Sequence, residues 1–243
     1  MKIELETIPV WDGVKSGSEC FVCDLMEESE KYAISFYLGN SVMNPETRVK
    51  VNEHGFCPTH YQMLLSANKP QGLALMTDTY LSTTVEKFEK SFEALLGAKP
   101  GRKMQAAIAD FSIQLEKREQ GCLVCTSMQD RLTRYCFTIA YLWNQDPEFK
   151  EALAKGKGFC LHHFQKLLEI SPKVLSGSSH AEFVKAITEL ELANIDRIKK
   201  DVWWMTQKYK SENYEESWKG CEDAHRRGVN KITGKSRVID PLK

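Results

Sequence analysis

The sequence predicts an all-α protein made of two tandem, pseudo-symmetric helical repeats. Three observations lead to this prediction: apolar residues recur at helical spacing, Gly and Pro gather in short breaks, and one cysteine–histidine pattern occurs twice. Hydrophobic residues make up 42% of the 243 residues, which is enough for a chain of this length to bury a core.

Two long segments carry an apolar stripe whose members lie three and four residues apart, as on one face of a helix. The first stripe consists of Leu81, Val85, Phe88, Phe92 and Leu95. The second consists of Ile195, Ile198, Val202, Met205 and Tyr209. A further helix is expected over residues 103–119, after the helix breakers Gly97, Pro100 and Gly101.

These features divide the chain into five parts. We expect an N-terminal extended segment over 1–17, a first helical repeat over 18–96, a linker over 97–102, a second helical repeat over 103–210 and a C-terminal tail over 211–243. The extended segment is expected because residues 3–8 alternate in polarity, and the tail is expected to wrap the surface because it has no periodicity.

Six of the eight cysteines fall into two copies of one pattern. The first copy is Cys20-x-x-Cys23 followed by Gly55-Phe56-Cys57-Pro-Thr-His60, with 33 residues between Cys23 and Cys57. The second is Cys122-x-x-Cys125 followed by Gly158-Phe159-Cys160-Leu-His-His163, with 34 residues between Cys125 and Cys160. The offset between copies is 102 residues at the CxxC and 103 at the GFCxxH, which indicates an internal duplication.

Each copy supplies three cysteines and one histidine, the full donor set of a tetrahedral zinc site. The CxxH pairs are expected to share one face at the start of a helix, where the thiolate is favoured. The predicted ligands are Cys20, Cys23, Cys57 and His60 for one ion, and Cys122, Cys125, Cys160 and His163 for a second. The spacing also allows the two copies to mix their ligands in one binuclear site, and the same donors suit an iron–sulfur cluster.

The remaining candidates have simpler interpretations. Cys136 lies in an apolar run and is expected to be a small, buried hydrophobic residue. Cys221 and His225 supply only two ligands, which do not make a metal site, so we expect them to have a surface or packing role. Glu46 and Glu148 each follow a proline, which is typical of acidic residues in the first turn of a helix. We prefer this interpretation to the alternative, in which each glutamate accepts a hydrogen bond from a ligand histidine. A dithiol redox pair would account for the CxxC motifs but not for the CxxH motifs.

The segments around these motifs resemble a bacterial protein family of unknown function, common in anaerobes, whose members carry CxxC and GFCxxH twice. The resemblance runs from about Cys20 to Gly234 and includes YLGNSVMNPETRVKVNEHGFCPTHYQMLL and the ending SWKGCEDAHRRGVNKITG. Cys221 and His225 depart from the family pattern. The resemblance implies the two-repeat architecture and the eight ligands, and it leaves the activity open.

The expected function is that of a cytoplasmic metal-binding protein with two zinc ions in a structural role and a helical surface for a protein partner. The N-terminus has no secretory signal, no apolar run is long enough for a membrane helix, and equal numbers of acidic and basic residues (33 each) argue against nucleic acid. Beyond the Cys/His sites, no catalytic motif is present. An iron–sulfur redox or sensor protein and a metal- or thiolate-dependent enzyme remain as alternatives, and the oligomeric state is open.

Overall fold

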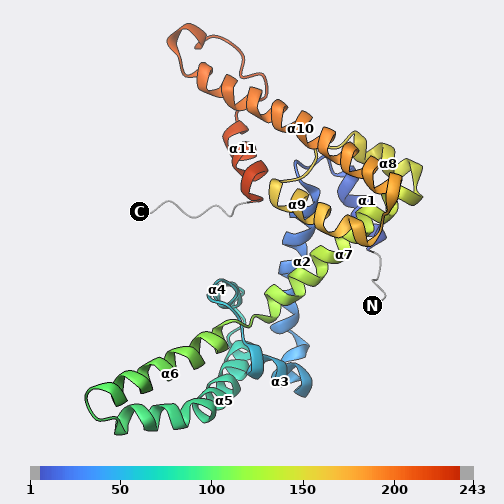
Figure 1. Ribbon diagram of the computed structural model, residues 1–243. Coiled ribbons are helices and arrows are strands. Elements are labelled where there is room, and N and C mark those ends of the chain that lie inside the picture. The colour runs from blue at the N-terminus through green and yellow to red at the C-terminus, as the bar shows by residue number, and fades with distance from the viewer. Residues whose placement is uncertain (1–5, 236–243) are drawn as a thin grey trace. The chain divides into compact units, whose positions relative to one another are not determined.

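A computed structural model describes residues 6–235, and this part of the chain is helical and contains no β-strand (Figure 1). The all-α prediction is therefore confirmed. The α-helices are α1 (Thr7–Lys15), α2 (Phe21–Tyr37), α3 (Pro45–His54), α4 (Pro58–Ser66), α5 (Pro70–Gly97), α6 (Arg102–Glu119), α7 (Leu123–Gln145), α8 (Pro147–Ala154), α9 (Leu161–Ile170), α10 (Gly177–Lys208) and α11 (Ala224–Thr233).

The helices pack into two compact units. Unit 1 contains the described residues up to Glu28 and from Asp130 onward, and unit 2 is Ser29–Gln129. The predicted linker over 97–102 joins α5 to α6 inside unit 2. These units reflect which helices pack together, whereas the predicted repeats reflect similarity between two parts of the sequence. The repeat boundaries therefore stay a prediction.

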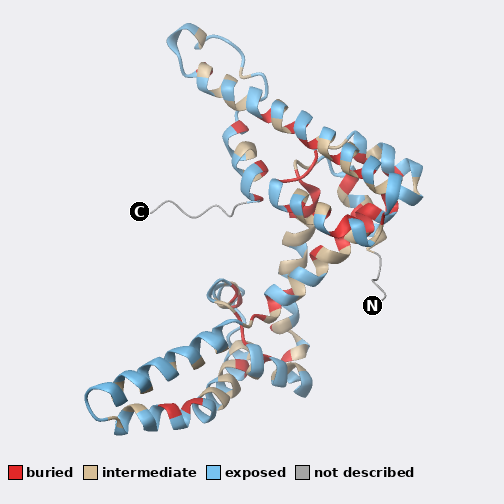
Figure 2. Ribbon diagram, in the orientation of Figure 1, coloured by how far each residue is buried: buried red, intermediate tan, exposed pale blue. Residues whose placement is uncertain are grey.

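The core of unit 1 is built from aromatic and branched side chains of α1, α7, α8, α9 and α10 (Figure 2). Phe149 and Phe183 are fully buried, and the ring of Trp11 meets that of Phe149 edge-on at 5.2 Å. Burial of such large side chains is the main favourable contribution to folding.

The N-terminal segment is helical where an extended segment was predicted. Thr7–Lys15 form α1 because Val10 and Val14, four residues apart, share the face that packs against the core. The prediction of extended structure is wrong for these residues, and residues 1–5 lie outside the described part of the chain.

The C-terminal tail also contains a helix that the sequence did not predict. Helix α11 packs on α10 and α9, and it buries Ala224 and Lys231, which are not large apolar residues. A Cβ added to Gly228 would lie 3.2 Å from Val202, so the two helices approach closely at this glycine. The segment lacks an apolar stripe because small residues and a lysine form its inner face. Residues 236–243 of the predicted tail lie outside the described residues.

Unit 2 has a smaller core and a long helical hairpin. Its fully buried side chains include Leu64 of α4 and Val124 of α7, and α3 packs against α5. Helices α5 and α6 form the hairpin, where Phe88 meets Phe111 at a ring distance of 5.5 Å. No residue of α6 is buried, and Figure 2 shows the hairpin as largely exposed.

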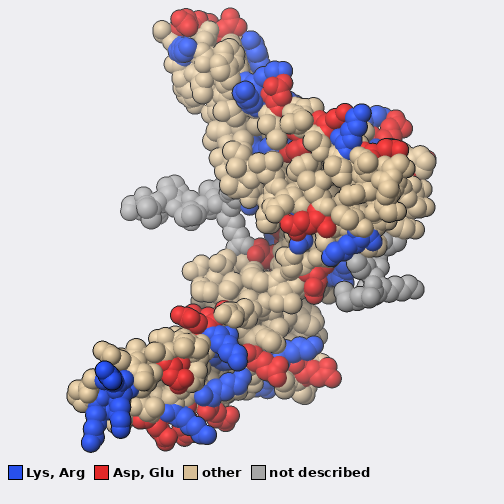
Figure 3. Space-filling view, viewed as in Figure 1, with Lys and Arg blue, Asp and Glu red and all other residues tan. Residues whose placement is uncertain are grey.

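Charged side chains of both signs are interspersed on the face of the molecule drawn in Figure 3. This distribution agrees with the equal totals of acidic and basic residues.

Candidate metal centres

The eight predicted ligands gather in two groups of four. Site 1 consists of Cys20, Cys23, Cys160 and His163, and site 2 of Cys57, His60, Cys122 and Cys125. Within each group the ligand atoms all lie within 4.8 Å of one another. The predicted grouping is therefore wrong, because each group combines the CxxC of one copy with the CxxH of the other. The two copies do exchange ligands, but they form two separate groups and not one binuclear site.

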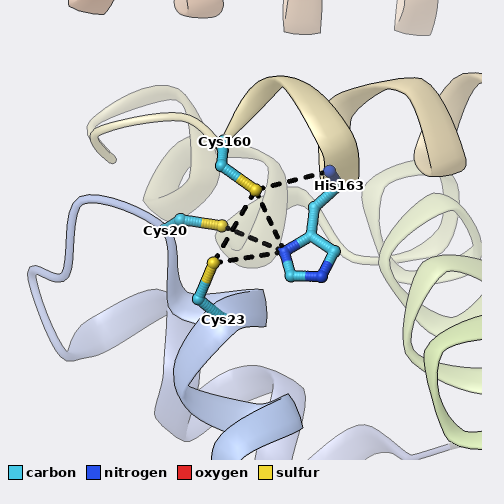
Figure 4. A group of neighbouring side chains, drawn as sticks. All are labelled: Cys20, Cys23, Cys160 and His163. Atoms are coloured by element: carbon cyan, nitrogen blue, oxygen red, sulfur yellow. Dashed lines mark hydrogen bonds between the residues drawn. The ribbon is translucent and has the colours of Figure 1, made fainter. Parts of the chain in front are cut away.

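Site 1 lies in unit 1, where the starts of α2 and α9 meet (Figure 4). The Nδ1 atom of His163 lies 3.4 Å from each of the three sulfurs, and the sulfurs of Cys23 and Cys160 are 3.7 Å apart. Cys160 is the N-cap of α9, and its sulfur accepts a hydrogen bond from the backbone N–H of His163. The helix start thus directs both CxxH side chains toward the same point, as the sequence predicted.

The loop before Cys160 is held by a buried ion pair that the sequence did not reveal. Lys231 of α11 and Glu191 of α10 lie 3.3 Å apart, and both are almost fully buried. Glu191 accepts a hydrogen bond from the backbone N–H of Phe159 at 2.8 Å, while Lys231 donates to the carbonyl of Phe159 at 2.7 Å. Two helices therefore fix the backbone of the residue next to the ligand Cys160.

Site 2 lies in unit 2, where the starts of α4 and α7 meet. The Nδ1 atom of His60 lies 3.1 Å from the sulfur of Cys57, 3.2 Å from that of Cys122 and 3.4 Å from that of Cys125. The sulfurs of Cys57 and Cys125 are 3.9 Å apart. The backbone N–H of Leu123 donates to the carbonyl of Gly55, which joins the loops that carry the two ligand pairs.

The glycine of each GFC motif has a positive φ, +63° at Gly55 and +76° at Gly158, which explains why both copies use glycine there. A Cβ at Gly158 would lie 2.6 Å from the carboxylate of Glu191, and a Cβ at Gly55 would lie 2.6 Å from the hydroxyl of Tyr80. Larger residues at these positions would displace the loops that present the ligands.

A carboxylate orients the histidine of site 2. The Nε2 atom of His60 lies 3.0 Å from Oε1 of Glu30 on α2, and His60 is buried. A ligand histidine typically donates its second ring N–H to a carboxylate in this way, which fixes the ring and strengthens its basicity. Glu46 and Glu148, the weighed candidates for this role, lie instead in the first turns of α3 and α8, as the preferred interpretation predicted.

The thiols and imidazoles of each group shift one another's pKa values in the metal-free protein. The hydrogen bond to Cys122 raises the pKa of His60 to about 9. Burial disfavours the Cys122 thiolate, but the hydrogen bond from His60 outweighs it and lowers the pKa of Cys122 to about 6. Partial desolvation, together with the neighbouring Cys122, raises the pKa of Cys125 to about 12. The hydrogen bond between His60 and Cys122 therefore favours the charged forms of both side chains.

Site 1 shows the same pattern. Hydrogen bonds from the Cys20 and Cys23 thiols lower the pKa of Cys160 far below its usual range, while burial raises the pKa of Cys20. Burial favours the neutral imidazole of His163, but hydrogen bonding to Cys160 outweighs it and the pKa rises to about 9. Each group thus favours a thiolate at one sulfur, Cys160 in site 1 and Cys122 in site 2, and thiolate sulfur is an atom that a soft or borderline metal ion prefers.

The other cysteines and histidines have structural surroundings. Cys136 is completely buried in the core, as predicted. Cys221 is also buried, while His225 is exposed. His180 lies 3.0 Å from the hydroxyl of Ser171. That hydroxyl belongs to a residue with no exposed surface, so this serine–histidine pair cannot reach a substrate.

The fold and the two groups define a class of all-helical proteins with paired Cys3His clusters capable of binding metal. The chain belongs to a family of unknown function, DUF6062, whose model matches residues 1–238. The predicted membership of an uncharacterised family is thereby confirmed. No curated protein and no solved structure matches the chain significantly. Within residues 6–235, none of the helices combines the length and the apolar character needed to cross a bilayer.

Proposed function

We propose that this protein binds two zinc ions, one in each Cys3His group, and that each ion stabilises the unit that contains it. The observation that carries the proposal is the close spacing of four donor atoms in each group. Three thiolates and one imidazole complete the coordination of zinc and leave no open position for a substrate, so we assign the ions a structural role.

The spacing within each group supports a single tetrahedral ion. With Zn–S bonds of about 2.3 Å and a Zn–N bond of about 2.0 Å, a tetrahedral site places its sulfurs about 3.8 Å apart and its nitrogen about 3.5 Å from each sulfur. The sulfurs of Cys23 and Cys160 are 3.7 Å apart and those of Cys57 and Cys125 are 3.9 Å apart, and the nitrogen–sulfur distances run from 3.1 to 3.4 Å.

The same spacing argues against an iron–sulfur cluster. A cluster places several irons and inorganic sulfides between its protein ligands, so ligands on different irons must lie farther apart than ligands that share one ion. Here all four donors of a group lie within 4.8 Å of one another. We therefore prefer a single zinc ion to the iron–sulfur alternative.

The structural role follows from what each group joins. Site 1 connects the start of α2 to the start of α9, and Cys23 and Cys160 are 137 residues apart. Site 2 connects α4 to α7, and α4 itself buries little apart from Leu64 and the ligand His60. Since metal binding by ligands distant in sequence is coupled to folding, each ion contributes directly to the stability of its unit.

We place the protein in the cytoplasm, since its eight cysteines form no disulfide and reduced thiols persist there. A protein partner would find exposed apolar side chains on the α5–α6 hairpin, among them Leu81, Val85 and Ile113. Such side chains suit docking of another protein.

Metal analysis of protein purified without oxygen tests the proposal. We expect two zinc per chain and no visible absorption, with one zinc lost in Cys57→Ser and none in Cys136→Ala, whose thiol lies outside both groups. Removing zinc with a chelator should lower the thermal midpoint. Iron with acid-labile sulfide, or a chain whose stability is the same without metal, would contradict the proposal.

A further inference from the structure

The two sites have the same donor atoms, but their ligand residues differ in exposure to solvent. All four residues of site 1 are buried, and Cys160 has no exposed surface. In site 2, Cys122 and His60 are buried, Cys57 is half-buried and Cys125 is exposed. Cys125 is therefore the ligand residue that small molecules in solution reach most easily.

The C-terminal end of α11 shields the ligands of site 1 from solvent. A Cβ added to Gly234 would lie 3.5 Å from the sulfur of Cys160 and 3.8 Å from that of Cys23, so the backbone of Gly234 lies against both sulfurs. Lys231 of α11 forms an ion pair with Glu191 of α10. Lys235, just after α11, forms ion pairs with Asp24 and Glu27 of α2. These ion pairs hold the segment in place over the ligands.

The exposed Cys125 has a nearby thiol with which it can react. Cys122 is the other member of its CxxC pair, only three positions away in sequence, and both sulfurs belong to the same four-ligand group. Glu30 adds a negative charge next to His60. This charge increases electron donation to the ion and leaves the ligand sulfurs more nucleophilic.

We propose that Cys125 is an oxidation site for hydroperoxides, and that its oxidation releases the ion of site 2 while site 1 keeps its ion. The inference rests on the proposed zinc binding and adds a regulatory role to one of the two sites. The closed site 1 would keep unit 1 folded while site 2 responds to the oxidant.

The chemistry balances with hydrogen peroxide as the oxidant. The Cys125 thiolate attacks one peroxide oxygen, the O–O bond breaks, and the departing hydroxide takes a proton to become water. Cys125 is then a sulfenic acid. The Cys122 thiolate attacks its sulfur, the S–S bond forms, the S–O bond breaks, and a second hydroxide leaves and is protonated to water. Two thiolates, one peroxide and two protons thus give one disulfide and two waters.

Oxidation removes two of the three anionic ligands of site 2. The ion then keeps only Cys57 and His60, which do not make a stable zinc site. Release of zinc therefore reports the oxidation directly.

The test uses the full-length protein, purified without oxygen and with its zinc content measured first. Hydrogen peroxide is added, released zinc is followed with a chromogenic chelator, and disulfides are located by peptide mass mapping. We expect one zinc to leave at least about tenfold faster than the other, together with a Cys122–Cys125 disulfide. Simultaneous release of both ions, release from site 1 first, or a disulfide that leaves out Cys122 or Cys125 would overturn the inference.

Two matched variants assign the released ion. Cys20→Ser leaves site 2 as the only complete site, so its remaining zinc should leave rapidly. Cys57→Ser leaves site 1, whose zinc should resist peroxide. If either variant fails to fold, the comparison of the two sites within the unaltered protein still decides the question. Fewer than two zinc before oxidation would overturn the proposed function and this inference with it, whereas two zinc with equal resistance would overturn the inference alone.

Discussion

The sulfur of Cys23 lies 3.7 Å from the sulfur of Cys160, although 137 residues separate them in the chain. Because Cys23 belongs to the first CxxC and Cys160 to the second CxxH, the contact joins the two copies of the motif. The same exchange occurs in site 2, where Cys57 lies 3.9 Å from Cys125. Neither copy of the pattern can therefore complete a four-ligand site alone.

Glu30→Gln should weaken zinc binding at site 2. The Glu30 carboxylate lies 3.0 Å from Nε2 of His60, and losing such a partner typically costs about 10- to 100-fold in metal affinity. Chelator competition, with the zinc of site 1 as internal reference, measures the change. Glu46→Gln is the matched control, since Glu46 lies in the first turn of α3 and should leave affinity unchanged. Equal effects of the two substitutions would show that Glu30 does not orient the ligand.

Lys231→Met should destabilise unit 1, because it leaves the Glu191 carboxylate buried without its cation. Breaking one partner of a buried pair costs about 3–5 kcal/mol. Denaturant unfolding of the zinc-loaded protein measures the loss. Lys200→Met removes an exposed pair with Asp196 and should change stability by no more than about 0.5 kcal/mol. A Lys231→Met protein as stable as the Lys200→Met protein would contradict the role assigned to the pair.

Gly158→Ala should also destabilise the protein, by at least about 1 kcal/mol, since the residue has a φ of +76° and its new Cβ would meet the Glu191 carboxylate. Gly97→Ala provides the comparison, because no atom lies within 4 Å of a Cβ at this helical position. Thermal unfolding of both variants should show a loss only in the first. An unchanged midpoint for Gly158→Ala would refute the argument from backbone conformation.

Zinc binding should strengthen as the pH rises. Before metal binds, the pKa values of His60 and His163 are raised to about 9, so both imidazoles are protonated at neutral pH. Zinc accepts only the neutral imidazole, and binding must displace these protons. Apparent affinity should therefore rise at least about tenfold per pH unit between about pH 6 and 8. It should continue to rise above the raised pKa of the histidines, because the Cys125 thiol, whose pKa is raised to about 12, must also lose its proton. Competition titrations at several pH values check this, and a flat profile would exclude proton release.

The helical class and the local geometry of the motifs follow from sequence alone. Helix-starting signals predict that Cys57 and His60 share a face, as do Cys160 and His163, and that Glu46 and Glu148 lie in first turns. These features depend on residues close together in the chain, where spacing carries the information.

The pairing of the sites and their supporting residues could not be predicted in this way. The two copies have nearly the same spacing, so the sequence is equally compatible with pairing within a copy and between copies. Glu30, Glu191 and Lys231 resemble ordinary charged residues of helical segments, and only the packing of distant helices brings them to the ligand loops. Helix α11 was missed because its buried face contains Ala224, Gly228 and Lys231, which form no apolar stripe.

The crosswise pairing of ligands is tested most directly by the zinc content of two double variants. Cys20→Ser combined with Cys160→Ser removes two ligands from site 1, so one zinc per chain should remain. Cys20→Ser combined with Cys57→Ser removes one ligand from each site, so both ions should be lost or weakly held. The reverse result, with one zinc retained by the Cys20/Cys57 variant and none by the Cys20/Cys160 variant, would show that each copy binds its own ion and would contradict the account.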